Sequence, residues 1–316
     1  CDAINSSVRI LNMEIPVLAT SSSHVSVIIP VYNSGAEVEA AVASALAQTH
    51  ASIEVIIVDD GSTDDTPQVQ SELARRYPNV VRTLSQQNGG PAAARNTGLQ
   101  MATHDWIAFL DHDDSWHPDK LSLQLATAEL TQADVVFTAT QIVDATGRVE
   151  QIRVVPGAET RGRIFEALLF DNFITLSSTL VRRSVLLEQN GFDQQWRGVE
   201  DWALSLSLAA KGIEFAGIKE PLVHYRWHSQ SLSRHHESMQ MQRKTLVANS
   251  LASPAGRKVP LMRRRRIRAN ERNGSAWFMA EQSFARAFSL YAQALVAWPF
   301  SLKAWKGLLK SSIGHI

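Results

Sequence analysis

The chain has 316 residues, of which 45% are hydrophobic and 20% charged, an ordinary globular composition with room for one large domain and an extension, or for two modest domains. Lys and Arg together number 31, as do Asp and Glu, so the net charge is zero and gives no sign of a nucleic-acid partner. A single cysteine excludes a disulfide framework within the chain, and no window approaches about 18 consecutive apolar residues. We therefore expect a cytoplasmic protein without a transmembrane helix.

Residues 1–23 are predicted to be a peripheral N-terminal segment. The stretch "ATSSSH" is typical of a linker, and no signal peptide is evident. The chain begins with Cys1, as a mature lipoprotein would. A fragment or an upstream-extended reading frame is the preferred interpretation, with Met13 as a candidate natural start.

Short β-branched runs alternate with helical patterns from residue 25 to residue 140. Strands are predicted over residues 25–32, 53–60, 80–86, 106–111 and 133–140, and helices over residues 36–48, 61–77, 90–102 and 117–130. Thr63 or Asp64 is the expected N-cap of the second helix, and Pro118 is expected in the first turn of the fourth. This alternation predicts an α/β fold with a mostly parallel central sheet flanked by helices.

The pattern loosens after residue 150. A helix is predicted over residues 162–170, a strand over 174–183, a helix over 199–212 and extended structure over 213–228. Polar and basic residues dominate from about residue 229, where helical structure is expected. Two amphipathic helices broken at Pro299 are predicted over residues 280–313.

Acidic residues follow two of the predicted buried strands. Asp59 and Asp60 end the second strand, and Asp111, Asp113 and Asp114 follow the fourth. Parallel sheets bind ligands at the carboxyl ends of their strands, and Mg²⁺ and Mn²⁺ prefer carboxylate oxygens. These acids could therefore hold a cation or hydrogen-bond sugar hydroxyls. The alternative is that they only cap the turns and helices that follow.

Several ordered motifs extend this picture. "VSVIIPVYN", "IEVIIVDDGSTDDT", "QNGGPAAARNTGL" and "WIAFLDHDDSW" occur in that order, followed by "GVEDWALSLSLAAKG" and "VHYRWHSQSLS". Together, over roughly residues 25–233, they resemble the inverting family-2 glycosyltransferases of the GT-A fold. The resemblance predicts a catalytic domain at residues 24–233 and a basic, helical C-terminal extension at residues 234–316.

The resemblance also implies site residues. The nucleotide-sugar site would comprise Pro30, Tyr32, Asn33, Asp59, Asp60, Arg95, Asp111 and Arg226. An Asp carboxylate that accepts the uracil N3–H favours a UDP-linked donor. Arg95 would pair with a phosphate or an Asp, or else form a salt bridge that only holds its loop.

The "DHDD" stretch matches the DXD motif of the family. Asp113 would bind Mn²⁺ or Mg²⁺, Asp111 would face the ribose or a water on the metal, and His228 would complete the metal site. An equally open reading places the His and Arg side chains of "HYRWH" on the solvated face of an edge strand.

The pair Glu200-Asp201 matches the family's ED motif. Asp201 would be the base that takes the acceptor proton, and Glu200 would contact the acceptor. The alternative is that both are first-turn acids favoured by the helix dipole.

The C-terminal segment has two readings. Leu302, Trp305, Leu308, Leu309 and Ile313 share one helical face, with three lysines beside it, and an anionic membrane could bind there. The preferred reading is that these helices pack on each other or on the catalytic domain.

The sequence thus predicts a metal-dependent inverting glycosyltransferase, cytoplasmic or peripheral at the inner face of the membrane. Its partners would be a nucleotide sugar and a saccharide or lipid-linked acceptor, in cell-envelope or exopolysaccharide assembly. The alternatives are a nucleotidyltransferase, which would need a basic Gly-rich loop after the first strand, and a non-catalytic sugar-nucleotide-binding protein.

Overall fold

The computed structural model describes residues 8–10, 13–15, 23–50, 52–144, 146–155, 164–226, 236–279 and 284–313. The chain forms two compact units. Unit 1 comprises Cys1–Gly162, Phe173–Gln195 and Glu200–Ser231, and unit 2 comprises Arg163–Asn172, Trp196–Val199 and Leu232–Ile316. The predicted division between residues 233 and 234 differs from this partition, because residues 163–172 and 196–199 belong to unit 2.

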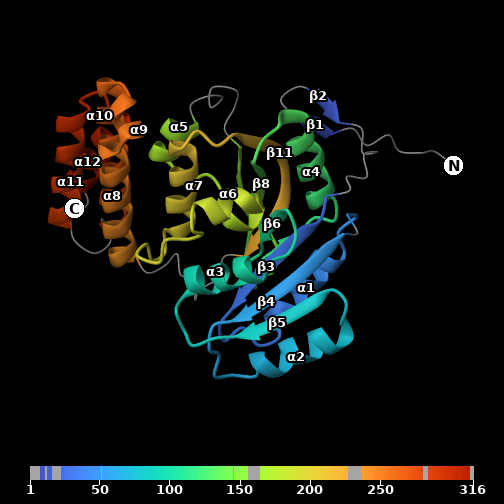
Figure 1. The fold of residues 1–316 in the computed structure, drawn as a ribbon. Coiled ribbons are helices and arrows are strands. Elements are labelled where there is room, and N and C mark those ends of the chain that lie inside the picture. Colours follow the sequence, from blue (N-terminus) through green and yellow to red (C-terminus); the bar gives the residue numbers. More distant parts are fainter. Residues whose placement is uncertain are drawn as a thin grey trace. The chain divides into compact units, whose positions relative to one another are not determined.

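A mixed sheet forms the centre of unit 1 (Figure 1). Among the described residues it has nine strands in the order β5–β4–β3–β6–β10–β8–β11–β7, with β9 paired to β8. The strands are β3 (Val25–Val31), β4 (Ile53–Asp59), β5 (Val81–Ser85), β6 (Trp106–Phe109), β7 (Ser115–Trp116), β8 (Val135–Val143), β9 (Val149–Arg153), β10 (Thr179–Arg182) and β11 (Phe215–Arg226). Only β7, β9 and β10 run antiparallel to their neighbours in this described sheet, so the prediction of a mostly parallel sheet is confirmed.

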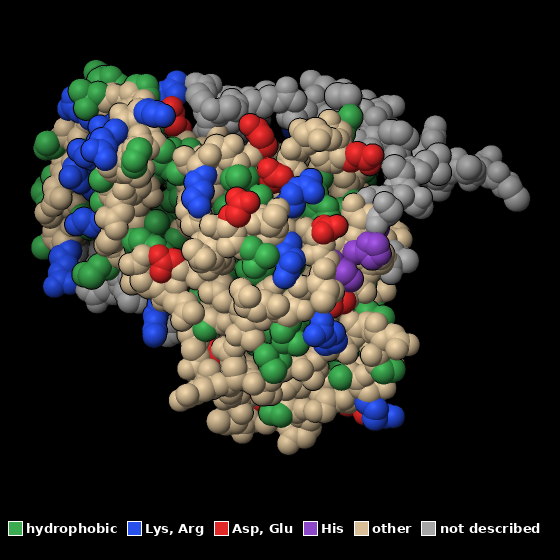
Figure 2. Space-filling model, viewed as in Figure 1, with side chains coloured by type: hydrophobic (Ala, Val, Ile, Leu, Met, Phe, Trp, Pro, Cys, Tyr) green, Lys and Arg blue, Asp and Glu red, His purple; other side chains and the backbone are tan. Residues whose placement is uncertain are grey.

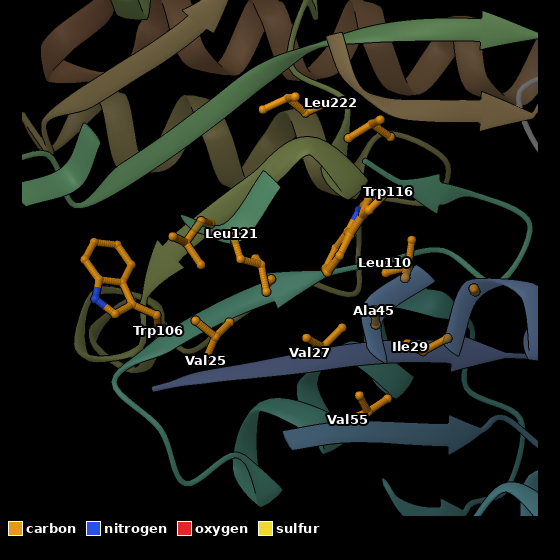
Figure 3. Close-up of a cluster of buried hydrophobic side chains, with 14 of the residues drawn as sticks. Val25, Val27, Ile29, Ala45, Val55, Trp106, Leu110, Trp116, Leu121 and Leu222 are labelled. Carbon is orange, nitrogen blue, oxygen red and sulfur yellow. The ribbon is translucent and has the colours of Figure 1, made fainter. Parts of the chain in front are cut away.

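Helices cover both faces of this sheet, and each face has its own apolar core. The helices of unit 1 are α1 (Glu37–Leu46), α2 (Thr66–Arg76), α3 (Pro91–Met101), α4 (Lys120–Thr131), α6 (Arg183–Glu188) and α7 (Glu200–Ala210). One cluster joins Val25, Val27 and Ile29 to α1, α2 and α4 (Figure 3). The other joins Ile28 to α3, α6 and α7. Successive β3 side chains alternate between the two cores, as strand geometry requires.

Several local predictions were wrong. Helix α2 has Asp65 as its N-cap, and Asp64 instead accepts the Thr66 N–H at 3.0 Å. Pro118 lies outside α4, which begins at Lys120. The predicted strand over residues 174–183 begins with a 3₁₀ turn, Leu176–Ser178, before β10. The sequence also gave no sign of β1 (Val8–Ile10) and β2 (Met13–Ile15), which pair within the segment predicted to be peripheral.

Unit 2 is helical. Its helices are α5 (Ile164–Phe170), α8 (His236–Ala252), α9 (Pro254–Lys258), α10 (Leu261–Met279), α11 (Phe284–Ala297) and α12 (Leu302–Ile313). Helix α5 joins this unit because Glu166 pairs with Arg263 and the Phe170 carbonyl accepts from Asn270 of α10. The predicted pair of helices flanking Pro299 is confirmed.

One buried cluster of unit 2 consists mainly of alanines. Ala269, Ala276, Ala287, Tyr291, Ala294 and Ala304 form the buried cluster. Helices α11 and α12 pack on each other through this cluster, as the preferred reading expects, while Leu302, Trp305 and Leu309 of α12 stay more than half exposed. No helix in the part of the chain described here is long and apolar enough to cross a bilayer.

Lys120 is an unusual member of the unit 1 core. Its side chain is fully buried, with Nζ donating to Gln124 Oε1 at 2.7 Å and lying 4.0 Å from the centre of the Trp116 ring. Burial lowers the pKa of Lys120 well below its ordinary value. The ring face favours the ammonium form and opposes that shift only in part.

Replacing Lys120 with Met should remove a pH dependence of stability. The unfolded chain binds a proton with the ordinary lysine pKa of about 10.4, while the folded chain releases it at a lower pH. Between these values the free energy of unfolding of the wild type rises with pH, by up to about 1.4 kcal/mol per unit. Urea unfolding from pH 7 to pH 10 should show the wild type gaining stability relative to Lys120→Met as pH rises. Exposed Lys211→Met is the control, and a pH-independent difference for Lys120→Met would contradict the prediction.

Candidate functional site

The carboxyl ends of three neighbouring parallel strands meet at one edge of the sheet. Strand β3 lies between β4 and β6 (Figure 1). The Asp60 N–H donates to the Val31 carbonyl at 2.9 Å, and the Leu110 N–H donates to the Ile28 carbonyl at 3.0 Å. The segments after β3, β4 and β6 therefore start at the same edge of the sheet. The predicted site residues in these segments lie at that edge.

The segment after β3 is held by the segment after β4. Asn33 has φ of +48°, donates its N–H to Ser62 Oγ at 2.9 Å and accepts the Thr63 N–H on Oδ1 at 2.8 Å. Tyr32 stands 48% exposed beside it. Pro30 is buried within β3. Of these three predicted residues, Tyr32 and Asn33 are exposed, and Tyr32 offers an aromatic ring to a ligand.

Asp60 organises the glycine-rich loop. Its Oδ1 accepts from Gln86 Nε2 at 2.8 Å and from the Gly89 N–H at 2.9 Å, and its Oδ2 accepts the Gly90 N–H at 2.7 Å. Gly90 has φ of +86° and is the N-cap of α3, so the carboxylate supports the start of that helix. A carboxylate has about four acceptor positions, and three are occupied here. Neighbouring Asp59, also buried, accepts the Ser62 N–H at 2.9 Å.

Arg95 joins two of the predicted acidic motifs. One terminal nitrogen donates to Asp111 Oδ1 at 2.8 Å and the other to Glu200 Oε1 at 3.1 Å. The Arg95 and Glu200 side chains are 7% and 9% exposed, against 28% for Asp111. The Phe192 ring lies 5.6 Å from the guanidinium carbon. The contacts of Arg95 are thus those of a salt bridge. Its side chain, on α3, connects the segment after β6 to the start of α7.

Electrostatics make this bridge strong. Burial alone would lower the pKa of Arg95, but the charges of Asp111 and Glu200 and their hydrogen bonds raise it above its ordinary value. Arg95 Nε and Glu200 Oε2 are buried without a hydrogen-bond partner among the described residues. Glu200 Oε2 therefore keeps an acceptor position that no described group fills.

Asp114 is the buried acid of the segment after β6, and its side chain accepts hydrogen bonds from Ser177 and from the backbone of Arg226. It is 2% exposed, accepts from Ser177 Oγ at 2.5 Å and accepts the Arg226 N–H at 3.1 Å. Burial raises the pKa of Asp114 well above its ordinary value, the charges of Asp113 and Asp111 raise it further, and the two hydrogen bonds oppose the shift. The buried Asp114 carboxyl therefore connects the segment after β6 to Ser177 and to the end of β11.

Sequence reasoning missed Ser177 and Gln86. Ser177 Oγ accepts the Asp111 N–H at 3.1 Å, and the Ser177 carbonyl accepts from Trp116 Nε1 at 2.8 Å. Gln86 links Asp60 to Thr97, whose hydroxyl donates to Oε1 at 2.6 Å. Two adjacent serines in "ITLSSTL" are unusual for the buried strand that the sequence predicts there, but the local sequence does not indicate which residues they contact. His112, for which the motif gives no role, has Nε2 3.9 Å from Glu37 Oε2.

A divalent cation fits this edge of the sheet only if a bound substrate supplies some of the atoms that coordinate it. No group of three His, Cys, Asp or Glu side chains that could hold a metal occurs among the residues that the structure describes. Mg²⁺ and Mn²⁺ sites often use one or two carboxylates and complete their shell with substrate phosphates. Partly buried Asp113, with Asp111, fits such a shared site. His228 lies outside the described residues, and the Arg226 side chain is exposed at the end of β11.

Glu200 and Asp201 open α7. Glu200 is held by Arg95, while Asp201 is half-buried and accepts the Trp202 N–H on Oδ1 at 2.6 Å. Both acids lie in the first turn of α7, so the helix-dipole alternative stays open for Asp201 beside its proposed role. The chemistry of this edge is that of a polar, carboxylate-rich ligand site anchored to buried hydrogen bonds.

Solved structures identify the class of this fold. S. aureus TarS residues 1–349 in complex with UDP-GlcNAc has a TM-score of 0.55 and 18% identity, with coverage of 91% of this chain and 90% of that chain. The mannosyltransferase PcManGT from Pyrobaculum calidifontis, in complex with GDP-Man and Mn²⁺, has a TM-score of 0.55 and 17% identity, with coverage of 93% and 88%. The fold is the GT-A type of glycosyltransferases, as the sequence predicts.

The family follows from sequence comparison. The model described as "Glycosyl transferase family 2" matches residues 26–187, about half of the chain. The chain therefore belongs to glycosyl transferase family 2, a family of glycosyltransferase enzymes.

Relatives include proteins of polysaccharide assembly. The succinoglycan biosynthesis protein ExoO of Rhizobium meliloti is 29% identical over 88% of this chain and 83% of its own length. The amylovoran biosynthesis glycosyltransferase AmsB of Erwinia amylovora is 28% identical over 66% and 72%. An uncharacterized glycosyltransferase of Rickettsia felis is 35% identical over 63% of this chain, and the match spans only 32% of that protein.

Arg95→Met should strongly destabilise unit 1. Removing one partner of a buried ion pair typically costs about 3–5 kcal/mol, because it leaves buried charge without compensation. Arg95→Lys should recover only part of this loss, since one ammonium cannot make both contacts at once. Adding Glu200→Gln to Arg95→Met should also recover stability, because it removes one stranded charge. Urea unfolding of the full chain measures the effect.

The matched control is Arg75→Met, whose partner Glu72 lies with it on the exposed surface of α2. That variant should leave the unfolding midpoint unchanged. If Arg95→Met unfolds at the wild-type midpoint, the bridge does not hold the site together.

Proposed function

We propose that this protein is an inverting glycosyltransferase that moves a sugar from a nucleoside-diphosphate donor to an acceptor hydroxyl. The observation that carries the proposal is the Arg95 bridge, which fixes Asp111 of the DXD motif to Glu200 of the ED motif at 2.8 and 3.1 Å. Leaving-group departure and hydroxyl attack occur on opposite sides of one anomeric carbon. A rigid link between a donor-side and an acceptor-side carboxylate suits that reaction.

The donor half of the proposal uses the ends of β3 and β4. Exposed Tyr32 offers a ring for the nucleobase, and Asn33 is exposed next to it in the chain. Pro30, Asp59 and Asp60 are the other proposed residues of this half, and Asp60 holds the loop before α3. A UDP-linked donor is the proposed substrate. TarS binds UDP-GlcNAc and PcManGT binds GDP-Man, which supports a nucleotide sugar as the class of donor. The exposed Arg226 side chain is a further proposed contact to the diphosphate.

Asp113 and Asp111 are the proposed ligands of Mn²⁺ or Mg²⁺. When bound, the cation would neutralise charge that develops on the departing diphosphate. Asp113 would contribute carboxylate oxygen directly, while Arg95 keeps Asp111 in place through one of its two oxygens. His228 remains a proposed third ligand outside the described residues.

Asp201 is the proposed base. Its carboxylate would accept the acceptor hydroxyl proton during attack, which is the proton transfer that inversion by direct displacement requires. Glu200 Oε2, buried without a hydrogen-bond partner in the described structure, would accept a hydrogen bond from the acceptor sugar. The proposed acceptor is a saccharide or lipid-linked saccharide in envelope or exopolysaccharide assembly. The names of ExoO and AmsB support this setting, and the protein would act peripherally at the inner face of the membrane.

Asp201→Asn should abolish most turnover without abolishing donor binding. General bases contribute about 10²- to 10⁴-fold to rate, and the amide cannot take the proton. The assay is release of nucleoside diphosphate from a panel of UDP- and GDP-sugars with Mn²⁺ and saccharide acceptors. Glu39→Gln, another first-turn helix acid, is the control and should keep full activity. Pyrophosphate release by the wild type, or full turnover by Asp201→Asn, would overturn the proposal.

Asp113→Ala should remove the metal dependence of nucleotide binding. Calorimetric titration of the wild type with UDP should give binding at least about tenfold tighter with Mn²⁺ than with EDTA, because the cation bridges protein and diphosphate. In Asp113→Ala the two titrations should coincide. An undiminished effect of Mn²⁺ in this variant would disprove the assignment, and Asp119→Ala, a surface acid before α4, is the matched control.

A further inference from the structure

Helix α12 carries an apolar stripe that the described structure leaves exposed. Leu302, Trp305 and Leu309 are 75%, 52% and 59% exposed. Their spacing of three and then four residues places them on one side of an α-helix. Three large apolar side chains in one row are a concentrated exposed surface, unlike the single ones scattered over most proteins.

The opposite side of α12 already has its packing partners. Ala304 is fully buried in the alanine-rich core of unit 2. A Cβ atom at Gly307 would lie 2.3 Å from Tyr291 Cζ, so the helix approaches Tyr291 of α11 as closely as a glycine allows. Helix α12 therefore packs within unit 2 through its small residues, and the apolar stripe takes no part in that packing.

A basic stripe runs beside the apolar one. Lys303, Lys306 and Lys310 are all exposed and follow the same helical spacing, one residue further along. Residues 261–313 hold ten Lys and Arg against two Glu, in a chain whose net charge is zero. Figure 2 shows Lys and Arg side chains interspersed with hydrophobic ones over these helices, at the left of the view.

The turn before α12 extends this composition. Val296 and Phe300 are 76% and 77% exposed. Arg265 donates to the backbone carbonyls of Ala297 and Val296 at 3.0 and 3.4 Å, which places a guanidinium at the end of α11 just before this turn. Exposed apolar residues and cations thus alternate over the turn as well as the helix.

We propose that this face of α12 binds the surface of an anionic phospholipid bilayer. The helix axis lies in the plane of the membrane, the apolar stripe enters the boundary between headgroups and acyl chains, and the lysines contact lipid phosphates. The inference deepens the proposed function, because it names the surface at which a lipid-linked acceptor would be met. Binding to vesicles needs no sugar transfer, so the two proposals can fail separately.

Two other occupants fit the face less well. Nucleic acid would attract the lysines but gain little from Leu302 and Leu309, which cannot stack on bases. A second copy of the chain would bury the apolar stripe but bring two rows of lysines together, with no acidic row to oppose them. A lipid surface offers both an apolar layer and negative charge.

Flotation of the full chain with vesicles tests the proposal. The protein should float at low salt with vesicles of equal parts phosphatidylglycerol and phosphatidylcholine, and stay at the bottom with phosphatidylcholine alone. Trp305→Gln with Leu309→Gln should abolish flotation. Lys306→Gln with Lys310→Gln should lower the partition constant about 25-fold, about fivefold per lysine. Both pairs are exposed, and circular dichroism should show unchanged helix content.

Matched controls are the exposed pairs Leu84→Gln with Leu130→Gln and Lys211→Gln with Lys219→Gln in unit 1, which should float like the wild type. Wild-type protein that stays at the bottom with anionic vesicles would overturn the inference. So would flotation that persists in the Trp305 and Leu309 double variant, or a wild-type dimer in size-exclusion chromatography that this variant alone converts to monomer without change in flotation.

Discussion

A single guanidinium holds the candidate site together. Arg95 lies on α3, while its two partners lie after β6 and at the start of α7. Two nitrogens of one planar group, each bound to a different carboxylate, fix both the distance and the orientation of the two acids, which a lysine cannot do. Because Arg95 and Glu200 are almost fully buried, their contact is kept at the cost of desolvating two charged groups.

Other buried carboxyls shape the loops that would surround a donor. Asp60 binds the backbone of the loop before α3, and Asp114 binds the backbone at the end of β11 and the hydroxyl of Ser177. These acids use their oxygens within the protein. Acids that are neighbours in sequence therefore differ in exposure: Asp111 and Asp113 are partly exposed, while Asp114 is buried. A motif of consecutive acids therefore contains both ligand candidates and structural anchors.

The sequence was most informative where structure is set locally. Alternating β-branched runs and helical periods predicted the parallel strands β3, β4, β5 and β6, and the acids after β4 and β6 indicated the edge that carries the candidate site. The sequence could not predict contacts between residues that are far apart along the chain. Arg95 and Glu200 are 105 residues apart, and Ser177 and Asp114 are 63 apart. Antiparallel β10 lies between β6 and β8, and the turn before it brings Ser177 into contact with Asp111 and Asp114. No periodicity in the sequence predicts that strand order.

A crystal structure of the full chain with UDP and Mn²⁺ would test the central claim most directly. We expect the cation to contact Asp113 and the diphosphate, and the base to lie against Tyr32. Arg95 should still bridge Asp111 and Glu200, leaving Asp201 at the open side of the site. Arg95 turned away from both carboxylates to bind phosphate, or UDP bound away from the ends of β3, β4 and β6, would contradict the account.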